Sequence, residues 1–511
     1  MRIMKGLLLL SAASLAATAA ASAADLPVKA KAVEYVKVCS LYGAGFYFIP
    51  GTDTCIRIGG AVRIDTSFNA AAYDIPFWQG GNGGNNLYTK NYYITRSRFN
   101  LNADTRTATE YGMLRTYADV KFDWTQDRES ISNGFTEVDF AFIQFAGFTI
   151  GKAVSNFDPQ WALSKPTISS GAQSGSNNGT GIPQLAYTAS FGNGVSGTIS
   201  LENAAPYRQA GLYNTANFIV APGASQFLTN AYGGAGASAG NTFLGNAVGG
   251  NHVPDVVANL RLDQAWGTLH GAAAFHEVAP GFYGSNESTG HAGESYGYAF
   301  SGAIELKNLP TGAGDSLKLE ASFAKGAAKY VFGGTTDTSG GGRYAKFDGS
   351  SLGFGYVLDG VFGTGGSIQQ STAWEVTAFY EHYWSPQWRT SLFGNYSHIA
   401  YGDGGNALLF AAFGSTTRGL GTSSATAPSG TSAGTLNATG NFDLGLAQVG
   451  TRTAWTPVQN LTLSGEFLYS RLDQNLNGTY TGNVSGKPAG TTYVLKDQNV
   501  YSGSVQVLRS F

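Results

Sequence analysis

The chain has 511 residues, of which 71 are Gly, 15 are Pro and 13% are charged. This glycine content is too low for collagen, which needs glycine at one position in three, and 43% apolar residues with little charge argue against intrinsic disorder. The net charge of −2 gives no reason to expect nucleic acid as a partner.

The first 23 residues are predicted to be an export signal. The short positive start Met1–Lys5 precedes an apolar stretch that runs through Ala20, and Ala21–Ala23 fits a small-x-small cleavage site. A membrane anchor is the alternative, but the apolar stretch is short and rich in Ala. No later apolar run reaches the length of a membrane-spanning helix.

Two cysteines, Cys39 and Cys55, flank the turn-like segment Ile49–Gly51. Export would place them in a compartment where disulfides persist. A single disulfide between them is therefore the favoured interpretation, and it would contribute roughly 3 kcal/mol in the chain-entropy description. A reactive or metal-binding pair is the alternative, but no His or acidic residue stands nearby at a suitable spacing.

From residue 55 onward the hydrophobic pattern has a period of two. Apolar residues of the segment Ile56–Phe68 fall on one face, while Arg57, Arg63 and Asp65 fall on the other. This alternation is typical of a strand and not of a helix. A soluble β-sandwich also alternates in this way, so the pattern alone does not decide between the two architectures.

The number and spacing of the candidate strands point to a barrel. We count sixteen, with eight long and seven short connections in strict alternation, as in an up-and-down transmembrane barrel. Segments of about ten residues suit tilted strands that cross a bilayer, and aromatic residues near many segment ends suit girdles at its two interfaces. Ordinary core aromatics are the alternative. The candidate strands begin near residues 55, 92, 110, 136, 148, 184, 194, 255, 268, 295, 316, 373, 388, 443, 461 and 500.

Several blocks of the sequence resemble the alphaproteobacterial general porins, the family of the Brucella-type outer-membrane porins. The segment that contains both cysteines is the most specific of them. The long connections at 204–254, 326–372 and 399–442 extend beyond what this resemblance accounts for. The matching blocks are Ala24–Pro27, Ala32–Cys39, Tyr42–Arg57, Phe140–Phe148, Pro254–Ala258, Gln264–Gly267 and Arg509–Phe511.

The resemblance implies an all-β protein, a 16-stranded antiparallel transmembrane β-barrel with short periplasmic turns and long extracellular loops. It implies a homotrimer in the bacterial outer membrane, in contact with lipid and lipopolysaccharide, that passes small hydrophilic solutes and ions. Residues 24–54 would form an N-terminal periplasmic segment and residues 55–511 the barrel. The third long loop, about 155–183, would fold into the lumen, and Phe511 would serve as an assembly signal.

The strand alternation predicts a charged patch on one wall of the lumen. Arg96 and Arg98 fall on the face that we assign to the lumen, so removing their positive charge should shift ion preference toward cations. Asp158 in the third long loop could face this wall and produce a transverse field. The alternative is that the arginines are rim or interface residues. The candidate pore-lining residues are Arg57, Arg63, Arg96, Arg98, Arg115, Asp119, Lys121 and Asp158.

The sequence contains no distinguishable catalytic, cofactor-binding or metal-binding constellation, and its six His show no metal-ligand spacing. We therefore expect a channel and not an enzyme, with no cofactor. Three alternatives remain: a barrel that acts as a surface adhesin or receptor through its long loops, a secreted soluble β protein, and a hydrolase carried by a barrel.

Overall fold

The structure is a computed structural model, and its residues fall into two compact units, Met1–Ile56 and Arg57–Phe511. The predicted export signal lies outside the residues that it describes. The described residues are 37–70, 84, 86–125, 135–168, 175, 180–203, 210–215, 248–284, 286–333, 342–414, 435–482 and 487–511.

The first unit is held together by a disulfide. Cys39 and Cys55 are bonded to each other, as the sequence favoured. A short strand, β1 (Tyr47–Phe48), pairs with Cys55 and Ile56, and a 3-10 turn, η1 (Ser40–Tyr42), precedes it. The buried half-cystines pack with Phe46, so this small unit has its own apolar centre.

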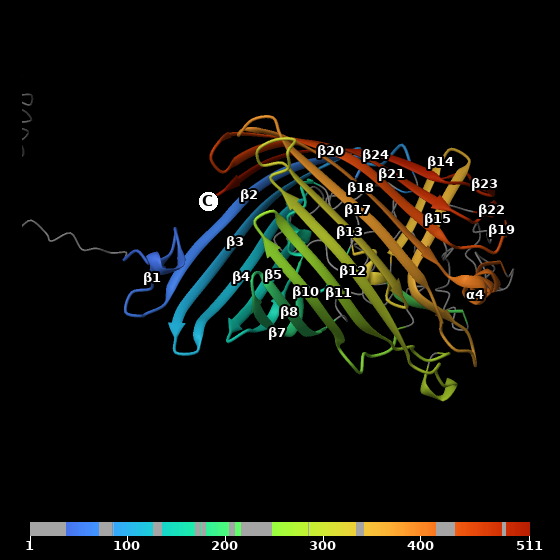
Figure 1. Cartoon of the computed structure of the whole chain (residues 1–511). Coiled ribbons are helices and arrows are strands. Elements are labelled where there is room, and N and C mark those ends of the chain that lie inside the picture. Colours follow the sequence, from blue (N-terminus) through green and yellow to red (C-terminus); the bar gives the residue numbers. More distant parts are fainter. Residues whose placement is uncertain are drawn as a thin grey trace, which may run out of the picture. The chain divides into compact units, whose positions relative to one another are not determined.

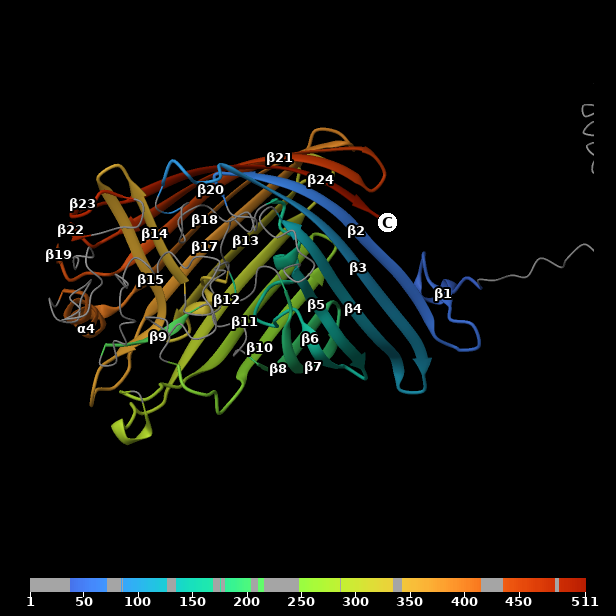
Figure 2. The same ribbon diagram turned by 180° about the vertical axis from the view of Figure 1, so that it is seen from behind.

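Sixteen antiparallel strands form a closed barrel (Figures 1 and 2). Each strand pairs with its neighbour along the chain, and the last strand pairs with the first. Every predicted strand start lies within two residues of an observed one, which confirms the predicted architecture. The barrel strands are β2 (Cys55–Phe68), β3 (Tyr93–Thr109), β4 (Gly112–Thr125), β5 (Phe135–Phe145), β6 (Phe148–Ala153), β7 (Ile182–Gly192), β8 (Val195–Glu202), β10 (Asp255–Gln264), β11 (Gly267–Val278), β12 (Ser295–Lys307), β13 (Ser316–Lys325), β17 (Thr372–Tyr383), β18 (Trp388–Ala400), β20 (Leu444–Val458), β21 (Leu461–Gln474) and β24 (Gln498–Ser510).

The outer face of the barrel is apolar and its inner face is polar. On β2 the side chains of Ile58, Val62, Ile64 and Phe68 are 42–52% exposed, whereas Asp65 between them is buried. Other strands repeat this alternation, because successive side chains of a strand point to opposite faces. A soluble sandwich would bury its apolar face, so this exposed apolar surface favours contact with lipid.

Aromatic side chains form two belts on the outer face. Near the short turns, Trp388 stacks on Trp455 with ring centroids 5.6 Å apart. Near the long loops, Phe275 stacks on Tyr296 at 5.1 Å. Amphipathic rings prefer the two membrane–water interfaces, so these belts mark the upper and lower limits of the apolar band.

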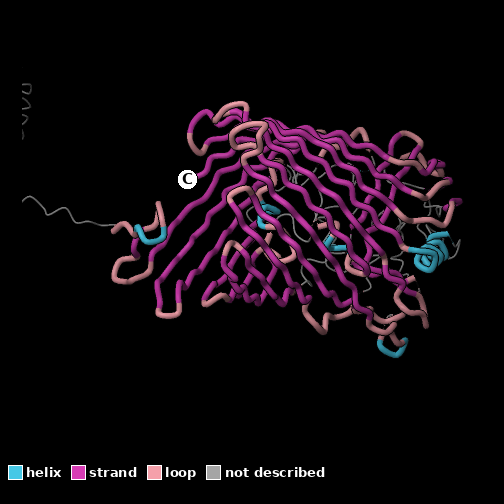
Figure 3. The backbone as a smooth tube through the Cα atoms, in the orientation of Figure 1, coloured by secondary structure: helices cyan, strands magenta, loops and turns pink. Residues whose placement is uncertain are grey.

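The long connections form a second sheet, which the sequence analysis did not predict. Strand β15 is its central element and pairs with four others, in parallel with β9 and β23 and antiparallel with β14 and β16. Figure 3 shows the mostly stranded structure, and within the described residues the longest helix is α4. The elements of the connections are η3 (Gln160–Leu163), β9 (Gly211–Asn214), η5 (Glu287–Thr289), η6 (Ala328–Tyr330), β14 (Gly342–Asp348), β15 (Ser351–Phe362), β16 (Gln369–Gln370), α4 (Gly402–Gly414), β19 (Thr435–Ala438), β22 (Gly478–Gly482) and β23 (Thr491–Leu495).

Strand β15 packs closely against the wall of the barrel. The backbone N–H of Phe354 donates to the side chain of Gln474 on β21 at 3.0 Å. At Gly353 a Cβ atom would come within 2.5 Å of Gln498 on β24, so only glycine allows this approach.

In the part of the chain that the structure describes, no helix is both long and apolar enough to cross a membrane.

Candidate pore lining

The predicted charged wall is a ladder of ion pairs on β2, β3 and β4. Seven cationic side chains and four carboxylates occupy the inward positions of these three strands. They are interleaved because residues on neighbouring strands stand directly opposite one another. The inward cations are Arg57, Arg63, Arg96, Arg98, Arg106, Arg115 and Lys121, and the inward carboxylates are Asp65, Asp104, Asp119 and Asp123.

Asp104 is the most heavily paired carboxylate of this wall. Its side chain is buried, and Arg115 donates to both of its oxygens at 2.9 and 3.1 Å. Arg106 also reaches it at 2.9 Å, and Arg57 lies 3.7 Å away. Bidentate Arg–carboxylate pairs have a fixed geometry, so Asp104 holds three guanidinium groups in place at one point of the wall.

Arg98 and Asp123 form a second bidentate pair. Nε and Nη2 of Arg98 each donate to one oxygen of Asp123 at 2.6 Å. Arg96 and Arg63 share Asp65, at 2.9 and 2.7 Å. These predicted arginines are therefore brought together, and each lies beside a carboxylate.

The exposure of the cations on this wall varies widely. The side chain of Arg57 is 45% exposed, whereas that of Arg96 is only 2% exposed. Lys121 forms an ion pair with Asp139 of β5, and Asp119 accepts a hydrogen bond from Asn100. Solutes would meet Arg57 more readily than Arg96, which has a supporting position in the ladder.

Arg106 was missed by the sequence analysis. Strand β3 continues to Thr109 and turns at residues 110–111, so Arg106 lies within the strand. The signal that could have found it is the uninterrupted alternation of Asn102, Asp104 and Arg106. Its position two residues from Asp104 on the same face explains their contact.

The start of the third long loop runs along the inner wall of the barrel. Its described residues from 155 to 168 make hydrogen bonds to strands from β8 round to β2. These contacts are Ser155 with Glu202 of β8, Asn156 with Asn259 of β10, Pro166 with Ser391 of β18, Thr167 with Arg452 of β20, and Ile168 with Glu466 of β21 and Arg63 of β2.

Asp158 lies on the wall-facing side of this loop segment. It is 4% exposed. Gly175 packs against it, because a Cβ atom added to Gly175 would lie 2.4 Å from Asp158 and 3.2 Å from Glu320 on β13. Strand β13 is six positions from β2 around the barrel. The structure thus places Asp158 beside β13, six to eight positions around the barrel from the arginine-bearing strands β2–β4 and so on the opposite wall, with its side chain buried.

Lys165 compensates for part of the negative charge in this region. Burial lowers the pKa of Lys165, whereas the carboxylates of Glu320, Asp158 and Glu375 act in the opposite direction. Its ammonium group also lies 5.8 Å from the ring centroid of Phe379. The loop segment therefore carries its own cation into a cluster of buried acids.

Phe511 lies at the seam that closes the barrel. Its backbone N–H donates to the carbonyl of Gly60 at 3.0 Å, and the N–H of Gly60 donates back at 3.1 Å. Its ring stacks on Phe99 with centroids 6.4 Å apart. A Cβ atom at Gly60 would come within 2.8 Å of the Phe511 ring, so glycine makes room for the terminal aromatic residue.

Comparison with known proteins supports the resemblance seen in the sequence. Porin Omp2b of Brucella suis biovar 1 is 30% identical over 286 residues, and that of Brucella melitensis biotype 1 is 29% identical over 286 residues. Each alignment covers 54% of this chain and 66% of the length of the relative. The outer membrane channel DcaP of Acinetobacter baumannii has the same fold, with a TM-score of 0.54 at 14% identity, covering 91% of this chain and 99% of that one.

A family model described as "Porin subfamily" matches residues 25–504, which is nearly the whole sequence. The match includes the strands that carry the arginine ladder and the loop segment that follows the inner wall. The chain therefore belongs to the porin subfamily.

Proposed function

We propose that this protein forms a water-filled channel in the bacterial outer membrane, through which small hydrophilic solutes and ions diffuse passively. The observation that carries the proposal is the closed barrel with an apolar outer and a charged inner face. Only helices and closed barrels satisfy their backbone hydrogen bonds in lipid, and a barrel of sixteen strands is wide enough for an aqueous lumen.

We propose further that the loop segment 155–168 narrows this lumen and that the ladder on β2–β4 lines the path beside it. Selectivity then depends on the charges and the width of the narrowest section. Seven cations against four carboxylates leave this wall with excess positive charge, which favours anions. The buried position of Asp158 supports a role in holding the loop segment and not in facing the solute.

The proposed assembly is a homotrimer whose remaining outer face contacts lipid and lipopolysaccharide. The exposed apolar band and its aromatic belts support a lipid-facing surface. Catalysis is not part of this proposal. Adhesion through the long loops is not favoured, because the family relationship is to channels.

The proposal is tested by reconstituting the detergent-purified protein in planar lipid bilayers. We expect stepwise ion conductance, and a reversal potential in a salt gradient that indicates anion preference. A barrel that inserts but does not conduct would favour the adhesin, and a protein that stays monomeric and soluble without detergent would exclude a membrane channel.

A charge substitution tests whether the charges of this wall, and not charges elsewhere on the molecule, set the ion preference. Arg57→Gln should shift the reversal potential toward cations, because Arg57 is the most exposed cation of the ladder and Asp104 keeps two other guanidinium partners. Arg509→Gln removes the same charge near the short turns on the exposed outer side and serves as the control. Equal reversal potentials for the two variants would contradict the assigned path.

A further inference from the structure

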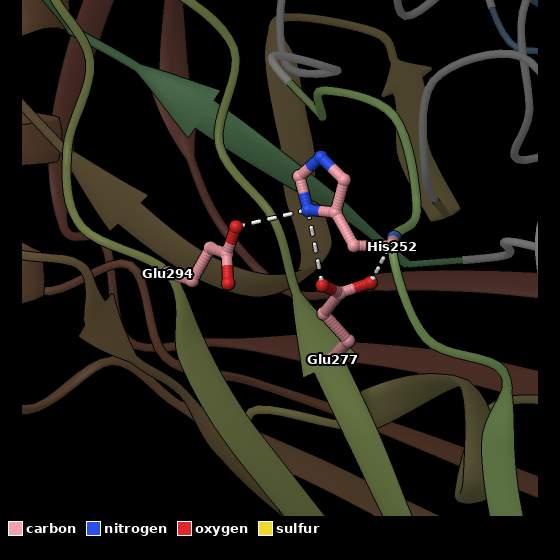
Figure 4. A group of neighbouring side chains, drawn as sticks. All are labelled: His252, Glu277 and Glu294. Atoms are coloured by element: carbon pink, nitrogen blue, oxygen red, sulfur yellow. Dashed lines mark hydrogen bonds and ion pairs between the residues drawn. The ribbon is translucent and has the colours of Figure 1, made fainter.

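Three ligand-type side chains meet at the long-loop rim of the barrel, away from the arginine ladder. His252 precedes β10, Glu277 lies near the end of β11, and Glu294 directly precedes β12. Their nearest nitrogen and oxygen atoms all lie within 4.8 Å of one another (Figure 4). Adjacent strands bring these three residues together, although they come from separate parts of the sequence.

The geometry points to a binding site for a divalent transition-metal ion, of which Zn²⁺ is the representative, at His252, Glu277 and Glu294. Nδ1 of His252 lies 3.3 Å from Oε1 of Glu277 and 2.9 Å from Oε1 of Glu294. In a tetrahedral zinc site, metal–ligand bonds of 2.0–2.1 Å place neighbouring ligand atoms about 3.3 Å apart. Both carboxylate oxygens therefore already stand close to the required spacing from the imidazole nitrogen, and the two oxygens lie within 4.8 Å of each other.

Two backbone hydrogen bonds fix the carboxylate of Glu277 in position before any metal binds. Its Oε2 atom accepts hydrogen bonds from the backbone N–H groups of His252 and Val253, at 2.7 and 3.1 Å. Its side chain is 1% exposed, and its Oε1 atom is buried without a hydrogen-bond partner. Leaving a buried charged oxygen unsatisfied is costly. A cation between Oε1 and the imidazole would remove that cost.

The ligand set selects the class of metal. An imidazole nitrogen with two carboxylates suits zinc and its first-row neighbours, whereas calcium and magnesium prefer ligand sets made of oxygen alone. His252 is 64% and Glu294 is 42% exposed, so a metal ion can enter from solvent. Three protein ligands leave a fourth coordination position for water.

The site lies on the outer side of the barrel and not in the lumen. Phe275 and Glu277 share one face of β11, and Phe275 is exposed in the aromatic belt. His276 between them points inward, where it pairs with buried Asp255. Bound metal would thus fasten the segment before β10 to the rim without entering the solute path.

This site is tested by isothermal titration calorimetry, in which ZnCl2 is added to the full-length protein in detergent. We expect one Zn²⁺ to bind per chain, and His252→Gln and Glu294→Gln each to weaken binding by at least about tenfold. His291→Gln and Glu287→Gln change the same residue types in the neighbouring exposed loop and should leave binding intact. Heat-modifiable migration on gels verifies that each variant is folded.

Two further measurements make the outcome unambiguous. Co²⁺ bound in place of Zn²⁺ should give visible absorption bands of a low-coordinate site in the unmodified protein and lose them in His252→Gln. Mg²⁺ and Ca²⁺ should not displace the zinc at equal concentration. The assignment is overturned if folded His252→Gln and Glu294→Gln bind zinc as the unmodified protein does, or if none binds it.

Discussion

At the residue scale, the charged wall is defined by pairing and not by the number of arginines. Arg98 is neutralised locally by Asp123, and Arg96 shares Asp65 with Arg63. The field that a solute meets is the small difference between many opposite charges. Single substitutions should therefore change selectivity through the partner that they leave behind as well as through the charge that they remove.

The Arg98–Asp123 pair gives a direct test of this view. Arg98→Gln should shift the reversal potential toward cations, because it leaves the Asp123 carboxylate without its bidentate partner. Asp123→Asn should shift it toward anions. The double variant should return close to the unmodified value in salt-gradient measurements. A double variant that keeps the shift of Arg98→Gln or that of Asp123→Asn would show that the two groups do not offset each other.

At the element scale, the second sheet depends on the close approach of β15 to the barrel. Gly353→Val should separate β15 from β24, because a Cβ atom there would also come within 2.9 Å of the backbone carbonyl of Lys496. Overpacking of this kind costs about 1–3 kcal/mol. We expect faster limited proteolysis of the segment 342–362 in the folded protein.

A glycine on a barrel strand provides the control for this substitution. At Gly465 on β21 there is open space around a Cβ atom, so Gly465→Ala should leave the proteolysis rate unchanged. If Gly353→Val were cleaved no faster than the unmodified protein, β15 would not depend on this packing.

Lys346 on β14 gives the second sheet a dependence on pH. Burial, together with the charge of nearby Lys90, lowers the pKa of Lys346 to about 8, against about 10.4 in an unfolded chain. Between these values the unfolded chain binds more protons, so the stability of the sheet rises as the pH rises. The destabilisation below pH 8 is on the order of 1–3 kcal/mol.

Lys346→Met removes this titration. We expect the variant to resist proteolysis of the second sheet better than the unmodified protein at pH 7 and to approach it at pH 10. Lys325→Met alters a lysine of barrel strand β13 and controls for general charge effects. Parallel pH profiles for Lys346→Met and the unmodified protein would contradict a buried, titrating Lys346.

The sequence predicted the barrel strands much better than the second sheet. Alternation such as that of Ile56–Phe68 reports one polar and one apolar face, so strand positions and their order follow from it. Strand β15 is buried along nearly its whole length, so both of its faces are covered, and its own sequence does not show which strands cover them. Those partners, β9 and β23, come from distant connections, which local patterns do not report.

Some features of the candidate pore lining could likewise be predicted from the sequence, and others could not. The inward positions of the arginines follow from strand parity, which the sequence contains. Their ion-pair partners depend on register between strands, and the position of Asp158 depends on where a loop lies against the wall. His252, Glu277 and Glu294 form no recognisable sequence motif, because they come from three separate segments of the rim.

At the scale of the whole molecule, the barrel exists only when its two ends meet. The pairing of β24 with β2 joins the last strand of the barrel to the first. The backbone of Phe511 extends this pairing by two hydrogen bonds to Gly60. An open sheet would leave both edges unpaired, which lipid does not tolerate.

Deleting Phe511 should therefore weaken closure of the barrel. The deletion removes both hydrogen bonds to Gly60 and the ring that packs on Phe99, so the folded form should convert to the unfolded form at a lower temperature in gel assays of heat modifiability. Phe511→Ala keeps the backbone bonds and should have an intermediate effect. Ser510→Ala shortens a neighbouring side chain without altering these contacts and should behave like the unmodified protein. Identical transition temperatures for the deletion and for Ser510→Ala would mean that the terminal residue contributes nothing to the stability of the closed barrel, and a separate defect in membrane insertion in cells would then have to come from recognition of the terminus during assembly.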